Sequence, residues 1–159
     1  MFKMAFDEIT SAAIELGFER VSSDQRAALE AFMNGSDVFV CLPTGSGKSL
    51  CYWALPTLFD RRAGKTDGSI VIVVSPLHAL MKDQIESLTR RSVSAAYAEK
   101  TKSDAILLDR IAEGKYQFVY ISPEMLLTDQ HWRNMIVTPV YKQNLIAFVV
   151  DEAHCVKTW

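Results

Sequence analysis

The stretch Leu42-Pro-Thr-Gly-Ser-Gly-Lys-Ser49, with the apolar run Val38-Phe-Val-Cys-Leu42 before it, decides the fold of this chain. The run predicts a buried strand that leads into a Gly-rich turn and then into a helix. In such a turn, glycines let backbone N–H groups converge on phosphate oxygens, and the helix presents its positive N-terminal end. Leu42 stands where the pattern G-x-x-x-x-G-K-[ST] usually has its first Gly, and Gly45 divides the loop instead. The alternative interpretation is a Gly-rich turn with a surface lysine.

Two side chains of this loop are candidates for direct chemistry. Lys48 would reach the β- and γ-phosphates of a nucleotide, and the Ser49 hydroxyl would ligate Mg²⁺. The remaining residues of the loop would surround the phosphates. The loop residues expected to bind a nucleotide are Thr44, Gly45, Ser46, Gly47, Lys48 and Ser49.

The composition describes a globular chain without a strong charge signal. The 159 residues suit one domain, 49% of them are hydrophobic, and the net charge is −2. No run approaches the ~18 apolar residues of a membrane helix, and the start does not resemble a signal peptide, so no membrane partner is expected. Three cysteines without a C-x-x-C pair suit a reducing compartment, which nuclear and bacterial cytoplasmic residence both satisfy.

Apolar runs that predict buried strands alternate along the chain with segments of helical spacing. Strands are predicted at residues 38–42, 69–75, 93–97, 117–122 and 145–150, and helices at 4–16, 25–33, 50–56, 79–88, 102–113 and 132–137. Residues 60–68 form the most loop-like segment. This alternation predicts a three-layer α/β domain with a mostly parallel sheet.

Two carboxylates follow the last predicted strand, at the sheet end where ligands of parallel sheets bind. Asp151 would hold Mg²⁺, mostly through water, and Glu152 would orient or deprotonate the attacking water. Taken alone, the pair could be a solvated turn, but its combination with the Gly-rich loop favours phosphate hydrolysis. His154 is interpreted as a structural hydrogen-bonder. No Cys/His spacing suits zinc, so no structural metal is expected.

Three further positions carry weaker signals. Ser75 and Ser122, each followed by proline, place hydroxyls and free backbone N–H groups at helix starts, which suits contact with a sugar-phosphate backbone. Plain helix capping is the alternative for both serines. Gln25 has an amide that can donate and accept at once, as the edge of adenine requires, although a lone Gln at a helix start is usually solvated.

Taken together, these stretches resemble the first motor lobe of superfamily 2 helicases, specifically the RecQ family of ATP-dependent DNA helicases. The resemblance is carried by residues 16–25 (motif 0), 43–52 (motif I), 74–84 (motif Ia), 120–124 (motif Ib) and 151–159 (motif II and the start of the aromatic-rich loop). Met81-x-Asp83-Gln84 is a feature that RNA helicases of the superfamily do not normally show. Ser22 departs from the family, because an Arg is usual at that place.

The resemblance implies a RecA-like P-loop NTPase lobe over residues 1–159, with ATP and Mg²⁺ as cofactors and DNA, as a single strand or a junction, as partner. It implies that Gln25 reads adenine and that Phe18 stacks on it. The DNA contacts that it implies are Ser75, Pro76, Gln84, Ser122 and Trp159.

The chain ends at Trp159, inside the part that resembles the aromatic-rich loop. A second motor lobe, which supplies an arginine finger in the family, does not follow in this sequence. We therefore expect a truncated helicase lobe that binds nucleotide weakly, hydrolyses it poorly and does not unwind DNA alone, since an arginine finger is worth ~10³–10⁵ in rate. The alternatives are a free-standing nucleotide- or DNA-binding module and an RNA helicase lobe.

Overall fold

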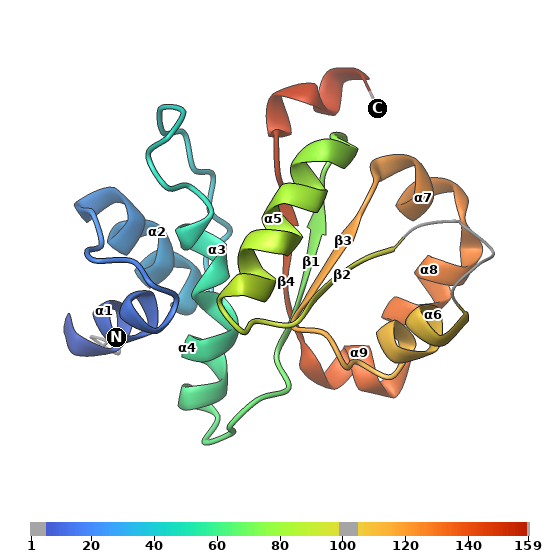
Figure 1. Cartoon of the computed structure of the whole chain (residues 1–159), viewed down its shortest axis with the longest axis horizontal. Helices are drawn as coiled ribbons and strands as arrows, with labels where there is room; N and C mark the ends of the chain where they lie inside the picture. The colour runs from blue at the N-terminus through green and yellow to red at the C-terminus, as the bar shows by residue number, and fades with distance from the viewer. Residues whose placement is uncertain (1–5, 99–104, 159) are drawn as a thin grey trace. The chain divides into compact units, whose positions relative to one another are not determined.

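The computed structural model describes residues 6–98 and 105–158 (Figure 1). Three predictions fall partly or wholly outside these residues: the start of the helix at 4–16, the start of the helix at 102–113, and the DNA contact at Trp159. The chain divides into two units, Met1–Asp67 and Gly68–Trp159, and each is described by itself.

The second unit is built on a four-stranded sheet with the strand order β2-β3-β1-β4 (Figure 1). Its strands are β1 (Ile70–Val74), β2 (Ala95–Tyr97), β3 (Phe118–Ile121) and β4 (Leu145–Val150). All three neighbouring pairs are parallel. The four strands predicted after residue 68 and the α/β class with a parallel sheet are thereby confirmed.

Helices cover both faces of this sheet. Helix α5 (His78–Arg90) lies on one face, and α6 (Ala105–Ala112), α7 (Pro123–Thr128), α8 (Gln130–Ile136) and α9 (Pro139–Asn144) lie on the other. The 3₁₀ helix η1 (Ala153–Thr158) follows β4. Alternate strand residues such as Ile72 and Ile121 form one core with Trp132 of α8. Tyr97 lies between two residues of that core in sequence, so its side chain points to the opposite face. There its ring contacts His78 of α5, with the two ring centroids 5.5 Å apart, which places α5 on that face.

Tyr141 links α9 to the end of α6 by a buried hydrogen bond. Its side chain is completely buried, and its hydroxyl donates to the carbonyl oxygen of Ile111 at 2.7 Å. Burial raises the pKa of Tyr141, so the phenol remains a neutral donor at physiological pH.

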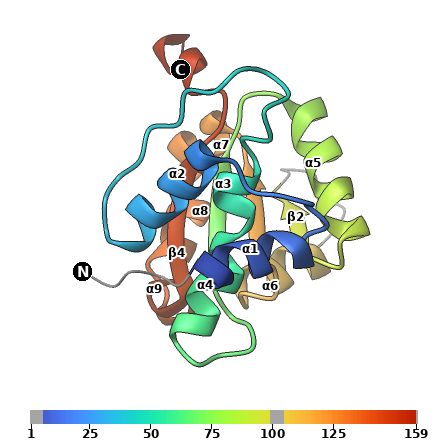
Figure 2. The ribbon, with the colours of Figure 1, turned by 90° about the vertical axis from the view of Figure 1, so that its left-hand side faces the viewer.

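The first unit consists of helices and connecting loops in its described part. The helices are α1 (Phe6–Glu15), α2 (Ser23–Met33), α3 (Leu50–Trp53) and α4 (Leu55–Arg62). Helix α1 contacts α4, and α2 contacts α3 (Figure 2). Gly17, with φ +79°, follows the end of α1, and Ser22 is the N-cap of α2, as the stop and start signals predict.

The predicted buried strand at 38–42 was wrong. These residues have no regular secondary structure, and the Phe39 side chain is 83% exposed. An apolar run becomes a buried strand only beside strands that can pair with it. The described elements of the first unit are all helices, so the run has no such partner there.

The predicted loop at 60–68 begins later than the composition suggests. Helix α4 continues to Arg62, and Asp60 is buried. Arg62 Nη1 donates to the carbonyl oxygen of Met33 at 2.6 Å, and Arg61 forms an ion pair with Glu15. These tertiary contacts stabilise a helical turn whose polar residues alone indicate a loop.

Strand β4 is less buried than predicted. Only Ala147 of this strand is fully buried, and Phe148 and Val150 are about half exposed. Phe148 and Val150 are two positions apart and share one face of the strand, and it is this face that is exposed, whereas Ala147 points to the buried face. The helical segment predicted at 132–137 became α8, and Pro139 begins α9 rather than following the last helix of the region.

Candidate functional site

The Gly-rich loop lies between α2 and α3, and its conformation depends on glycine. Gly45 and Gly47 have φ values of +78° and +75°, in the left-handed region that side chains disfavour. At Gly47 a Cβ would also lie 2.8 Å from Nε2 of Gln25, so the Gln25 amide would have to move away from the loop. The loop thus has the left-handed turns and the close main-chain approach that a phosphate-binding loop needs.

The Lys48 side chain folds back over this loop. Its Nζ donates to the carbonyl oxygen of Leu42 at 2.9 Å and, at 3.4 Å, to that of Pro43. Both acceptors are neutral, whereas a phosphate oxygen would form a shorter and stronger charge-assisted hydrogen bond. An anionic ligand at the loop therefore offers the ammonium group better partners than those it has in this structure.

Gln25 joins the start of α2 to the Gly-rich loop. Its Oε1 accepts from the backbone N–H of Ser22 at 2.8 Å, and its Nε2 donates to the carbonyl oxygens of Ser46 and Gly47 at 3.0 and 3.1 Å. Ser22 Oγ in turn accepts from the Gln25 backbone, which completes a capping box. With 6% of its surface exposed, Gln25 is not the solvated glutamine of the alternative interpretation. Its contact with adenine stays a prediction.

Phe18 is supported by an aromatic residue that the sequence analysis did not single out. The rings of Phe18 and Trp53 meet edge to face, with centroids 6.2 Å apart. Trp53 is buried, whereas Phe18 is half-buried and keeps part of its ring accessible. The signal for Trp53 was present in the aromatic pair Tyr52-Trp53, but helical spacing assigned it to the core.

In the second unit, the parallel strands bring three predicted site residues to the same end of the sheet, where the strands have their carboxyl ends. Ser75, Ser122 and Asp151 each follow the last residue of β1, β3 or β4. Pairing continues past the strand ends, since the Ser75 N–H donates to Ile121 O at 3.1 Å and the Asp151 N–H to Val74 O at 2.9 Å. The sequence places four polar positions at the carboxyl ends of strands: the Gly-rich loop and these three. Ser75, Ser122 and Asp151 lie there, whereas the Gly-rich loop follows no strand in the structure.

The Asp151 carboxylate is held by one donor on each oxygen. Oδ2 accepts from Nε2 of Gln84 at 2.9 Å, and Oδ1 accepts from the backbone N–H of Glu152 at 3.0 Å. Each oxygen keeps lone-pair capacity, and the side chain is only half-buried, so an ion or its water shell can approach. This donor set fits a carboxylate that contacts Mg²⁺ through water.

Glu152 has an unusual backbone conformation. Its φ of +52° lies in the left-handed region, which non-glycine residues adopt only where the surrounding structure imposes it. Its Oε2 lies 3.2 Å from Nδ1 of His154, a distance at which the two side chains form an ion pair when the imidazole is protonated. The two neighbouring carboxylates of this turn thus have different partners: Gln84 and the Glu152 N–H for Asp151, and His154 for Glu152.

The predicted DNA contacts occupy different environments. Ser122 Oγ accepts from the Met125 N–H and caps α7, which is the capping role named as the alternative. Ser75 is buried, and its Oγ is the one buried side-chain oxygen or nitrogen of the described residues without a hydrogen-bond partner. Pro76 is half-buried, and the Gln84 amide is directed to Asp151.

Within residues 6–98 and 105–158, no three or more His, Cys, Asp or Glu side chains gather as metal ligands would. The helices of the same residues include none with the length and apolar character needed to cross a membrane.

The family model of the DEAD/DEAH box helicases matches residues 22–159, so this chain belongs to the DEAD/DEAH box helicase family. Its relatives across most of its length are RecQ-family DNA helicases, at 28–40% identity. The chain is 40% identical to the ATP-dependent helicase SGS1 of Saccharomyces cerevisiae over 142 residues. These residues cover 86% of this chain and 9% of that protein. It is 35% identical to the ATP-dependent DNA helicase RecQ of Bacillus subtilis, over 90% of this chain and 23% of that protein.

A solved structure shares the fold. The chain is similar to the DUF1998 helicase MrfA bound to DNA and AMPPNP, with a TM-score of 0.70 and 19% identity, over 97% of this chain and 22% of that one. The predicted RecA-like α/β class is thereby confirmed. The chain spans less than a quarter of each of these three relatives.

Proposed function

We propose that this chain is the ATP-binding lobe of a RecQ-like DNA helicase, which couples hydrolysis of Mg·ATP to DNA strand separation within a longer protein. The observation that carries the proposal is the loop with Lys48 Nζ folded over it and two left-handed glycines inside it. Family membership over residues 22–159 supports the assignment to helicases. Residues 1–159 are proposed as one motor lobe that works with a second.

In this proposal, the residues of the first unit bind the nucleotide. Lys48 would exchange its two carbonyl partners for the β- and γ-phosphates, while the backbone of the loop would donate to phosphate oxygens. The Ser49 hydroxyl makes no capping hydrogen bond and is suited to an Mg²⁺ ligand. To read the edge of adenine, the Gln25 amide would exchange the loop carbonyls that it contacts here for the base, and the accessible part of the Phe18 ring would stack on that base.

The carboxylates of the second unit carry the hydrolytic step. Mg²⁺, when bound, would offset the charge that accumulates on the phosphates. Asp151 would hold it through water with the oxygens that Gln84 and the Glu152 N–H orient. Glu152 would orient the attacking water and take its proton, which is the role of a general base.

DNA is proposed to contact the carboxyl edge of the sheet. Ser75, Pro76, Ser122 and Trp159 remain the proposed contacts. Because the Ser75 and Ser122 side chains are buried here, contact through their hydroxyls would require a local rearrangement at the carboxyl ends of β1 and β3. A single strand or a junction is the proposed substrate, and a second motor lobe is the proposed partner. The cysteines described as free are compatible with nuclear or bacterial cytoplasmic residence.

A nucleotide-selectivity measurement tests this proposal. The chain should bind a fluorescent ATP analogue in the presence of Mg²⁺ more tightly than the matching GTP analogue. Gln25→Ala should reduce that preference ~10-fold, because a lost hydrogen bond to a buried base is worth about 1–2 kcal/mol. Titrations of both analogues by fluorescence anisotropy give the ratio.

The control is Ser22→Ala, which removes the capping hydroxyl but keeps the Gln25 amide. This variant should lose stability and keep its preference for ATP. Equal binding of the two analogues by the unmodified chain, or an unchanged ratio in Gln25→Ala, would contradict the adenine assignment.

A further inference from the structure

We propose that Gln84 is a positioning residue for Asp151: its side-chain amide sets the orientation of the carboxylate that would carry Mg²⁺, and so ties the metal site to helix α5. This inference rests on the proposed function, because Asp151 has a metal-binding role only there. It gives Gln84 a different task from the DNA contact that the sequence resemblance implies.

The first support is that both the backbone and the carboxylate of Asp151 are held by hydrogen bonds. Its backbone N–H donates to Val74 O at 2.9 Å, so the main chain of Asp151 is part of the β1–β4 pairing. Its Oδ1 accepts from the next backbone N–H along the chain, at Glu152. Gln84 Nε2 donates to Oδ2 at 2.9 Å across 67 positions of sequence. Among the described residues, the Glu152 N–H is the other donor that opposes rotation of the Asp151 carboxylate.

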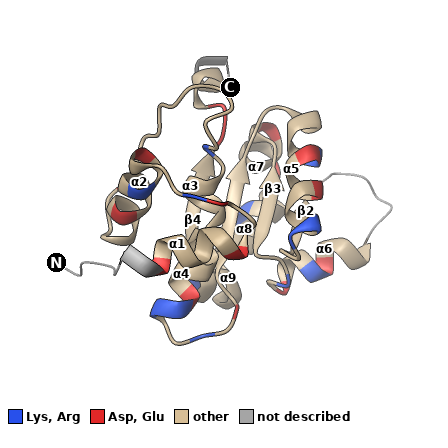
Figure 3. Cartoon of the chain, turned by 60° about the vertical axis from the view of Figure 1, so that its left-hand side comes forward, with Lys and Arg blue, Asp and Glu red and all other residues tan. Residues whose placement is uncertain are grey.

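The second support is the rigid placement of Gln84. Met81 and Leu88 are fully buried and anchor α5. Gln84 lies three residues after the first and four before the second, so all three share one stripe of the helix. The outward side of α5 carries charged residues of both signs (Figure 3). Because Gln84 lies on the same side of α5 as these two buried residues, its amide is held where it can donate to the Asp151 carboxylate.

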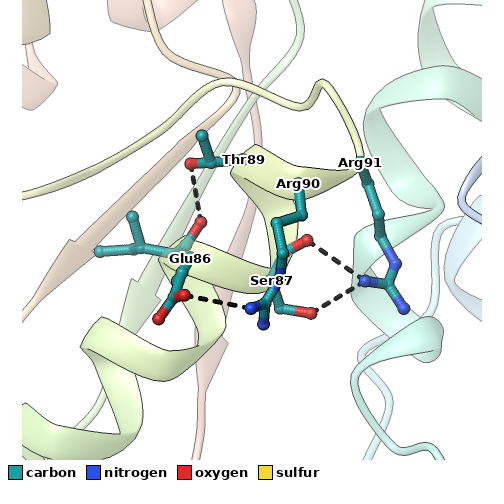
Figure 4. A network of polar contacts seen from close by, with 6 residues as sticks. Glu86, Ser87, Thr89, Arg90 and Arg91 are labelled. Atoms are coloured by element: carbon teal, nitrogen blue, oxygen red, sulfur yellow. Dashed lines mark hydrogen bonds and ion pairs between the residues drawn. The ribbon is translucent and has the colours of Figure 1, made fainter.

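The end of α5 is fastened by its own polar network. Arg90 pairs with Glu86 at 3.0 Å, and Arg91 Nη1 donates to the Ser87 hydroxyl at 2.9 Å and the Ser87 carbonyl at 3.2 Å (Figure 4). Thr89 Oγ1 donates to the carbonyl oxygen of Ile85 at 2.8 Å. These contacts oppose fraying of the turn that follows Gln84.

The chemistry of an amide suits this task. A neutral N–H donor stabilises the ionised carboxylate without bringing a positive charge that would repel a metal cation, as Lys or Arg would. It uses one lone pair of Oδ2 and leaves the others for a metal-bound water. Groups that orient a metal ligand in this way commonly change metal affinity 10–100-fold when they are removed.

The test measures metal affinity, not turnover. The full chain is loaded with a non-hydrolysable ATP analogue, and Mn²⁺ is titrated while the electron paramagnetic resonance signal of free Mn²⁺ is recorded. Gln84→Met keeps the length and helix preference of the side chain but removes the donor. It should weaken Mn²⁺ binding ~10-fold, while the affinity for the analogue in EDTA stays unchanged.

The matched control is Gln130→Met, since Gln130 Nε2 donates to Asn134 Oδ1 at 2.8 Å on the exposed surface of the same unit. It should leave Mn²⁺ affinity unaltered. Gln84→Asn retains an amide too short to reach Asp151 and should reproduce the loss, which keeps the test valid if the methionine variant does not fold. Mn²⁺ affinity within twofold of wild type in a folded Gln84 variant overturns the inference. An unmodified chain that shows no metal-dependent nucleotide binding overturns the proposed function itself.

Discussion

Replacing Lys48 by alanine is expected to abolish measurable binding of Mg·ATP at concentrations that saturate the unmodified chain. The ammonium group lies over the Gly-rich loop on two neutral carbonyl oxygens, and phosphate oxygens are the stronger acceptors. Hydrogen bonds to charged groups are worth about 1.5–3 kcal/mol each, so losing contacts to two phosphates should weaken binding more than ~100-fold. Isothermal titration calorimetry measures the affinity directly.

Lys65→Ala is the matched control for this measurement. Lys65 is an exposed lysine of the same unit, located in the loop after α4. Its replacement removes the same charge and should leave the affinity unchanged. Unchanged affinity in Lys48→Ala would instead show that the Gly-rich loop does not hold the phosphates.

Replacing Glu152 by glutamine is expected to separate binding from hydrolysis. In a longer chain that also carries the second motor lobe, the variant should bind Mg·ATP normally and lose DNA-stimulated turnover ~10²–10⁴-fold, as the removal of a general base does. The substitution keeps the size of the side chain, and its backbone N–H still donates to Asp151 Oδ1. Phosphate release measured with and without single-stranded DNA gives the rates.

The control for Glu152→Gln is Glu113→Gln, which alters an exposed carboxylate next to the end of α6. This variant should hydrolyse ATP at the unmodified rate. Retained DNA-stimulated turnover in Glu152→Gln would remove Glu152 from the role of base, whereas weaker ATP binding would indicate a part in holding the nucleotide.

The sheet of the second unit was predictable because each of its strands is a short apolar run between helical segments. Ile70–Val74 consists of β-branched residues and is buried along its whole length, as a strand with neighbours on both sides should be. Once the strands are parallel, their carboxyl ends must share an edge. That geometric fact placed Ser75, Ser122 and Asp151 together before any coordinates were known.

Features that depend on distant partners were not predictable. The run at 38–42 has the composition of a buried strand, but no strand of the first unit pairs with it. Strand β4 has an equally apolar sequence, yet the face that carries Phe148 and Val150 is about half exposed. An apolar sequence indicates that a segment favours burial, but it does not indicate whether another element lies beside it to bury it.

The candidate site, too, has residues that the sequence predicts and contacts that it does not. Residue type and spacing were enough to single out Lys48, Asp151 and Gln25. They were not enough to show that Gln25 holds the loop carbonyls or that Gln84 donates to Asp151, because both contacts join residues more than 20 positions apart. Each is a tertiary hydrogen bond whose donor looks like an ordinary polar helix residue in the sequence.

The central claim is that one Mg·ATP engages the Gly-rich loop and the two carboxylates after β4 at the same time. It is tested most directly by nuclear magnetic resonance with Mn²⁺ and a non-hydrolysable ATP analogue, since Mn²⁺ broadens the signals of nearby amides. The account predicts that the amides of residues 44–49 and of Asp151 and Glu152 broaden together, and that the diamagnetic Mg²⁺ complex leaves them sharp. Broadening of residues 44–49 alone, with Asp151 and Glu152 unaffected, would contradict it.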